Sequence, residues 1–141
     1  MKAPWHLWLI GIVSLLWNAV GAYDYVMTNT RNAAYLSNFT EDQLAYFTEF
    51  PTWVTVFWSL GIGGALLGSI LLLMRSRMAI WSFLVSLVGM LVTSFFGLVL
   101  SPISLVDVMG VGAATFSLAI LLVGLFLFAY ARRMKMRGVL S

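Results

Sequence analysis

Five side chains of this chain are candidates for chemistry, and their types point to a polar path or a binding site. Asn18, Asp24 and Tyr25 lie on one apolar segment, Thr93 lies on a later one, and Glu49 stands in a connecting loop. An amide in an apolar interior can hold a polar ligand, and two carboxylates can hold a cation or a proton. We therefore treat these five residues as candidate binding residues.

A structural role is the alternative for each of these polar residues. An amide surrounded by hydrocarbon must find a partner inside the protein, so Asn18 would bond to Thr93, Ser94 or a backbone carbonyl. Asp24 lies near one end of its apolar segment, where it would reach water or pair with Arg31. The sequence favours the structural role for both residues.

Catalytic and metal-binding groups are scarce in this sequence. His6 is the only histidine, and there is no cysteine. Zinc takes three or four protein ligands, a haem normally takes two axial ligands between helices, and a catalytic triad needs a histidine near a nucleophile. The sequence therefore predicts no catalytic residue, no metal and no cofactor, and we expect a protein that is not an enzyme.

The composition is that of a chain surrounded by lipid. Of 141 residues 62% are hydrophobic and 9% are charged, whereas soluble domains carry about 25% charged residues. The basic residues form short clusters beside apolar stretches, where they set membrane topology. They form no basic surface interleaved with aromatic residues, so we expect membrane lipids and no nucleic acid as partners.

Four apolar stretches are long enough for a helix to cross a bilayer, which takes about 20 residues. They are Trp5–Met27, Thr52–Met74, Met78–Leu100 and Val108–Ala131, with a loop over Thr28–Phe50 and a tail over Arg132–Ser141. The connections Arg75–Arg77 and Ser101–Asp107 are short, and Pro102 favours a helix stop. The sequence predicts an all-α membrane protein, an antiparallel bundle of four transmembrane helices that forms a single domain over residues 1–141.

The charges predict which way this bundle faces. The acidic residues lie near the end of the first stretch or after the first and third stretches, and every basic residue except Arg31 lies at the opposite ends. Because cytoplasmic loops carry the excess of Lys and Arg, both termini and the Arg75–Arg77 turn should be cytoplasmic. Val20-Gly21-Ala22 resembles a signal-peptide cleavage site, but the apolar run continues to Met27, which favours a retained helix.

The loop over Thr28–Phe50 should contain a short external amphipathic helix. Thr40 and Gln43 have the spacing of a capping box, in which each side chain bonds the backbone N–H of the other. Glu41 lies between them, in the first turn, where the helix dipole favours negative charge. Pro51 should end this helix and begin the next one.

Small residues indicate where the helices pack, because lipid leaves close packing as the main attraction between them. They are Gly61, Gly64 and Gly68 on the second stretch and Ser86 and Gly89 on the third. The Gly64-xxx-Gly68 pattern fits either packing inside the bundle or the seam of a homodimer.

Three stretches resemble a family of small proteobacterial inner-membrane proteins of about this length, which automatic naming often labels "sugar transporter". The stretches are Pro4–Trp8, Ser14–Asn32 with Trp17-Asn18 and Tyr23-Asp24-Tyr25, and Leu44–Leu73 with Phe50-Pro51. The resemblance implies the inner-membrane location and assigns no functional residue. Small sugar exporters carry a Pro-Gln pair in a helix and small multidrug antiporters use a Glu in the first helix, and this chain has neither.

Two functions remain open from the sequence. The first is a non-enzymatic accessory or assembly subunit that acts through helix contacts with another membrane protein, a second copy of itself, or lipids. The second is a small homodimeric transporter or channel for a small solute, with Asn18, Asp24 and Thr93 along its path. A dry, packed bundle would favour the first, and a polar cavity that reaches Asp24 would favour the second.

Overall fold

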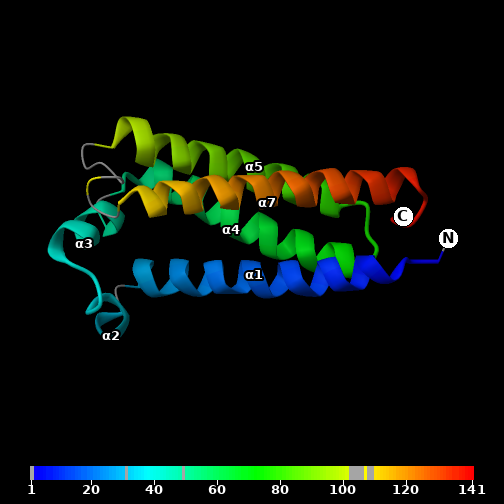
Figure 1. The fold of residues 1–141 in the computed structure, drawn as a ribbon, viewed down its shortest axis with the longest axis horizontal. Coiled ribbons are helices and arrows are strands. Elements are labelled where there is room, and N and C mark those ends of the chain that lie inside the picture. The colour runs from blue at the N-terminus through cyan, green and yellow to red at the C-terminus, as the bar shows by residue number, and fades with distance from the viewer. Residues whose placement is uncertain (1, 31, 49, 102–106, 108–109) are drawn as a thin grey trace.

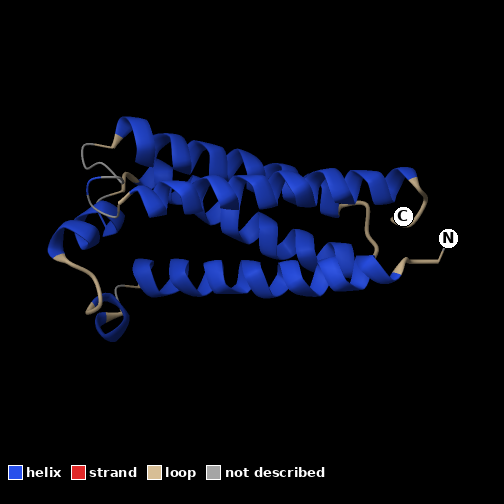
Figure 2. Ribbon diagram, in the orientation of Figure 1, coloured by secondary structure: helices blue, strands red, loops and turns tan. Residues whose placement is uncertain are grey.

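The chain is helical throughout its regular structure, over the part that the structure describes (Figure 2). The computed structural model describes residues 2–30, 32–48, 50–101, 107 and 110–141, and for residues 46–48 the backbone alone. The helices are α1 (Trp5–Asn29), α2 (Ala33–Leu36), α3 (Glu41–Thr48), α4 (Thr52–Leu73), α5 (Ala79–Phe95), the π-helical turn η1 (Phe96–Leu100) and α7 (Val111–Met136).

Four of these helices are long and apolar enough to cross a membrane: α1, α4, α5 together with η1, and α7. Their outward faces expose large apolar side chains, among them Leu9, Leu67, Leu91 and Leu122. Such a surface suits lipid and not water. The structure therefore confirms the prediction of an all-helical protein with four candidate spans and indicates a multi-pass membrane protein.

The two ends of the molecule differ in charge. The start of α1 and the end of α7 lie at one end, and α2 and α3 lie at the other (Figure 1). We name the first the basic end, because it holds Arg75, Arg77, Arg132, Arg133, Lys135 and Arg137, and the second the acidic end, because it holds Asp24, Glu41 and Asp42.

Helix α4 packs against α1 on one side and against α5 on the other, and α5 packs against α7 (Figure 1). Two serines of α5 set the register with α4. The hydroxyl of Ser82 donates to the Gly64 carbonyl at 2.7 Å, and that of Ser86 donates to the Gly61 carbonyl at 2.6 Å. Both bonds bring a side chain against the backbone of α4, so the two helices approach closely.

The glycines proposed as packing residues all lie at this α4–α5 interface. A Cβ at Gly64 would lie 2.9 Å from the Ser82 carbonyl oxygen, one at Gly68 would lie 2.7 Å from the Phe83 ring, and one at Gly89 would lie 2.6 Å from the Gly61 nitrogen. Helix α5 therefore covers the Gly64-xxx-Gly68 stripe, and a second copy of the chain could reach it only after α5 had moved.

The basic end contains the apolar core, where Leu7, Leu72, Phe83 and Met134 are almost fully buried. The chain after α7 closes over this core. The segment 139–141 buries Val139 and Leu140, and Ser141 exchanges backbone hydrogen bonds with Arg75 and Arg77 at 3.1 and 3.2 Å.

The last span differs from its expected bounds of Val108–Ala131. Its helix begins at Val111 and continues to Met136, so the segment expected as a tail begins inside α7. Arg133 and Lys135 suit the last turn, because the helix dipole favours positive charge there. Gly138, with φ of +78°, then turns the chain back toward the core. The expected stop at Pro102 lies outside the described residues.

The acidic end contains the short helix that the sequence predicts between the first two spans. The Gln43 backbone N–H donates to Thr40 Oγ1 at 3.2 Å, and the Thr40 backbone N–H donates to Gln43 Oε1 at 3.1 Å. These two bonds confirm the capping box at the start of α3. The sequence did not predict α2, whose first turn is capped by Asn32.

Substitution of Gly64 tests the close approach of α4 and α5. Gly64→Ala would force its Cβ against backbone atoms of α5, and overpacking of this kind costs about 1–3 kcal/mol. The neighbouring Gly63 faces open space, so Gly63→Ala should keep or raise stability by removing a helical glycine. Thermal unfolding of both variants in detergent should give a lower melting temperature for Gly64→Ala alone. Equal melting temperatures would contradict this interface.

Candidate functional site

A cavity of about 550 Å³ occupies the acidic half of the helices, and we name it the acidic-end cavity. Residues of α1, α4, α5 and α7 form its walls, and Tyr35 and Phe39 lie at its mouth. Small side chains leave the room for it: a Cβ at Gly21 would meet no other atom within 4 Å. Ligand sites of proteins typically have volumes of about 300–1,000 Å³, so the cavity is large enough for a small molecule.

Asn18 lines the inner end of the cavity and belongs to a buried cluster with Ser14 and Ser69. The Asn18 amide donates to the Ala65 carbonyl at 3.1 Å and to Ser69 Oγ at 2.9 Å. Ser14 Oγ lies 3.0 Å from Ser69 Oγ, within hydrogen-bond distance. Since lipid offers no partner to these groups, the cluster fixes α1 against α4 at this level.

The partners of Asn18 agree in part with the expected ones. A backbone carbonyl does accept from Asn18, but the side-chain partner is Ser69 and not Thr93 or Ser94. Thr93 lies on α5 and donates to the Gly89 carbonyl of its own helix at 2.8 Å. Asn18 faces α4, because α1 packs on that helix. Ser69 follows Gly61 and Ala65 at intervals of four residues, which places it on the same face of α4. This spacing could have identified Ser69 as a candidate partner of Asn18 from the sequence.

One acceptor of this cluster remains available to a ligand. The Ala65 carbonyl can only accept, so the Asn18 amide must present its NH₂ group to α4. Among the described hydrogen bonds, none uses the Oδ1 of Asn18. No side-chain nitrogen or oxygen of the described residues is both fully buried and unpartnered. Asn18 lines the cavity, and its Oδ1, which has no partner among the described hydrogen bonds, is not fully buried.

Asp24 stands at the mouth of the cavity and accepts a hydrogen bond from the Tyr35 hydroxyl. Burial and the neighbouring Asp24 raise the pKa of Tyr35 to about 12, so this phenol stays a neutral donor at physiological pH. The rings of Tyr23 and Phe39 contact the Tyr35 ring, with centroid distances of 5.8 and 5.7 Å. Sequence reasoning missed Tyr35, because only the fold of α2 brings it to Asp24.

The remaining candidates divide between the cavity wall and its surroundings. Thr93 lines the cavity. Tyr25 turns toward α4, where its ring lies 5.0 Å from that of Trp58, and Trp58 itself lines the cavity. Glu49, and the expected Asp24 partner Arg31, lie outside the described residues. Trp17 and Phe116 approach each other across α1 and α7, with ring centroids 5.9 Å apart.

His6 is remote from this site. It lies at the basic end, where its Nδ1 is 2.5 Å from the Tyr130 hydroxyl. Among the described residues, no group of three or more His, Cys, Asp or Glu side chains could hold a metal ion.

Apolar and aromatic walls with a few polar groups can bind a small molecule. Asn18 Oδ1 and Asp24 provide acceptors at the inner end and the mouth. No family model, curated protein or solved structure matches this chain.

Replacement of Asn18 tests the buried cluster. Asn18→Leu removes both bonds to α4, and interhelical hydrogen bonds in membranes contribute about 0.6 kcal/mol on average and up to about 1.7 kcal/mol. We expect a loss of that size in unfolding free energy, measured by denaturant titration in detergent. Thr115→Val is the control, since Thr115 is exposed and bonds within α7. If both variants lose the same free energy, the cluster does not hold α1.

Titration of Tyr35 tests the contact at the mouth. A pKa raised to about 12 from 10.0 means that folding favours the protonated phenol. The stability that this contact provides is therefore complete below pH 10 and is lost as the pH rises through 12. Tyrosinate absorbance of the native protein should include one late-ionising group that is missing in Tyr35→Phe and that ionises earlier in Asp24→Asn. Identical curves for all three proteins would contradict the contact.

Proposed function

We propose that this chain is a non-enzymatic protein of the bacterial inner membrane that binds an amphipathic small molecule in the acidic-end cavity, as an accessory or assembly subunit. In this proposal the four spans form an antiparallel bundle, with the basic end and both termini in the cytoplasm. The sorted charges support this orientation, since basic residues gather at cytoplasmic ends. The resemblance to the small proteobacterial inner-membrane family supports the location.

The observation that carries the proposal is that the cavity occupies one half of the molecule alone. It reaches from Asp24 to Asn18, which is bonded to Ser69 in a buried cluster with Ser14. Beyond this cluster lies the apolar core of the basic end, with Leu72 and Phe83 almost fully buried. A polar cavity that reaches Asp24 would favour a carrier, but the walls of this cavity are mostly apolar and it ends at Asn18. A site of this shape holds a molecule in one half of the protein.

The chemistry of the cavity indicates the class of ligand. Its walls are apolar, while Asn18 Oδ1 and Asp24 both accept hydrogen bonds and Asp24 carries a negative charge. A molecule with an apolar body and a donor or positively charged end matches this arrangement. Anionic molecules would meet the like charge of Asp24 and are disfavoured.

Binding of n-octylammonium to the protein in neutral phosphatidylcholine nanodiscs tests this function. We expect it to bind and to change the fluorescence of Trp17 and Trp58, which line the cavity. Octanoate should bind more weakly. Asp24→Asn should weaken octylammonium binding about tenfold, equivalent to about 1.4 kcal/mol. The same change at Asp42, an exposed acid of α3, is the control and should have no effect.

A second pair of variants tests the volume of the cavity. Gly21→Leu should fill the space and prevent binding, whereas Gly63→Leu, at an outward glycine of α4, should leave binding unchanged. Equal affinity in all four variants would show that octylammonium partitions into lipid and would overturn the proposed site.

A small carrier is the second candidate, and the extension of the cavity from Asp24 to Asn18 and Thr93 favours it. Sealed vesicles distinguish the two functions. A carrier would accumulate octylammonium in its wild-type form and lose uptake in Asp24→Asn, whereas a binding subunit would bind without uptake. Isolation of the subunit from native membranes should also bring a stoichiometric membrane-protein partner, and repeated recovery of the chain alone would remove the accessory role.

A further inference from the structure

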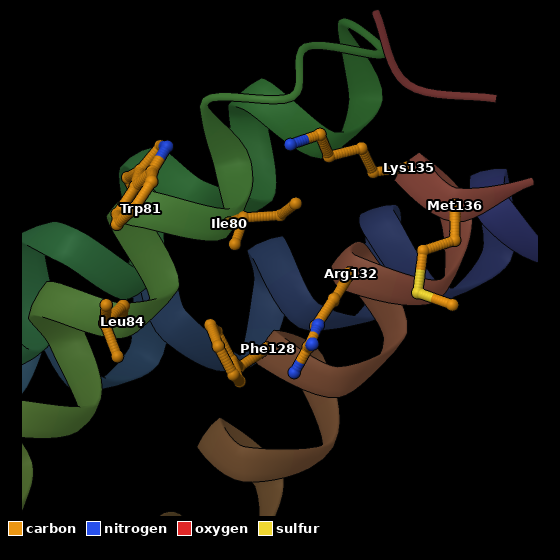
Figure 3. Close-up of a pocket in the computed structure, with 7 residues that line it drawn as sticks. All are labelled: Ile80, Trp81, Leu84, Phe128, Arg132, Lys135 and Met136. Carbon is orange, nitrogen blue, oxygen red and sulfur yellow. The ribbon is translucent and has the colours of Figure 1, made fainter. Parts of the chain in front are cut away.

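A second hollow, of about 460 Å³, lies at the basic end between α5 and α7 (Figure 3). We name it the basic-end groove. Ile80, Trp81 and Leu84 of α5 and Phe128, Arg132 and Lys135 of α7 line it. Figure 3 shows the cationic side chains of α7 on one side of the groove and the apolar side chains of α5 on the other. The groove is separate from the acidic-end cavity and plays no part in the function proposed above.

The groove holds positive charge without a counter-charge. Arg132 and Lys135 are three residues apart, so they project from one face of α7. The acids of the described residues, Asp24, Glu41, Asp42 and Asp107, belong to segments of the acidic end. Within the described part of the chain, neither Arg132 nor Lys135 forms an ion pair, so the groove attracts an anion.

The position of these charges along the helices matches the edge of a membrane. Arg132 and Lys135 lie in the last two turns of α7, and Trp81 lies in the first turn of α5. Trp81 is 59% exposed, as expected of a tryptophan at the level of lipid headgroups. Leu84 and Phe128 lie one turn deeper than Trp81 and Arg132 respectively. Cations at the membrane surface therefore stand directly above an apolar wall.

We propose that the basic-end groove binds an anionic phospholipid of the bilayer, with Arg132 and Lys135 on its phosphate and one acyl chain along Leu84 and Phe128. The two cations suit a phosphate because basic pockets between transmembrane helices bind such headgroups. The apolar wall distinguishes a lipid from a soluble anion, since inorganic phosphate gains nothing from contact with Leu84 and Phe128.

Native mass spectrometry of the full chain, supplied with phosphatidylglycerol or phosphatidylcholine in detergent, tests this site. The native protein should retain phosphatidylglycerol in preference to phosphatidylcholine. The double variant Arg132→Gln with Lys135→Gln should lose that retention about tenfold or more, since each basic residue near an anionic surface contributes roughly 1 kcal/mol. Glutamine keeps the length and polarity of the side chains, and an unchanged melting temperature will show that the variant is folded.

The control has the same net charge as the groove variant. Arg133→Gln with Arg137→Gln removes two cations of the same helix end that do not line the groove. This control should retain phosphatidylglycerol as the native protein does. An equal loss in both double variants would mean that general surface charge attracts the lipid, and it would overturn the proposal.

Two further measurements identify the bound molecule as a lipid. Phosphatidylglycerol with brominated acyl chains should quench tryptophan fluorescence in the native protein, and Trp81→Phe should remove that component of the quenching. Inorganic phosphate at millimolar concentration should not displace the lipid. Displacement by phosphate, or quenching that is unchanged in Trp81→Phe, would contradict the acyl chain along the groove.

Discussion

The close approach of α4 to its two neighbours is the interaction on which the rest of the structure depends. In lipid, burial of apolar side chains gives helices little reason to associate, so contacts between backbones and hydrogen bonds must hold them together. One side of α4 meets α5 through Gly61, Gly64 and Gly68, with the hydroxyls of Ser82 and Ser86 on its carbonyls. Another side meets α1 through Ala65 and Ser69.

The position of the cavity is set by the point along α1 at which this helix stops packing closely against α4. At the basic half, Gly11 lies so close to α4 that a Cβ there would come within 2.8 Å of the Leu73 Cγ. At the level of Asn18 the helices are bonded together, and beyond it Gly21 meets nothing. Identical residues thus have opposite effects on the same helix: Gly11 permits contact with α4, and Gly21 leaves space. The Asn18 cluster lies between the close contact at Gly11 and the open space at Gly21.

Local features of this protein could be predicted from its sequence, and features that depend on helix pairing could not. The capping box of Thr40 and Gln43 involves residues three apart, and the spans follow from composition alone. The sequence indicated that Asn18 needs an internal partner, but not that the partner is Ser69, because any of three helices could have faced it. Tyr35 could not be identified from the sequence for the same reason, because its hydroxyl reaches Asp24 only once α2 has folded.

The turn between α4 and α5 has a consequence for the order in which the molecule is completed. Arg75 adopts a left-handed backbone conformation, with φ of +57°, and its Nε donates to the Val139 carbonyl at 3.1 Å. A hairpin of α4 and α5 has all of its own contacts as soon as both helices have left the ribosome. The turn also has bonds of its own within that hairpin, among them Ser76 N–H to the Leu71 carbonyl at 2.9 Å. Its bonds to residues 139–141 need a segment that is synthesised after α7, so the cover over the basic end is added to a helix pair whose turn can already form.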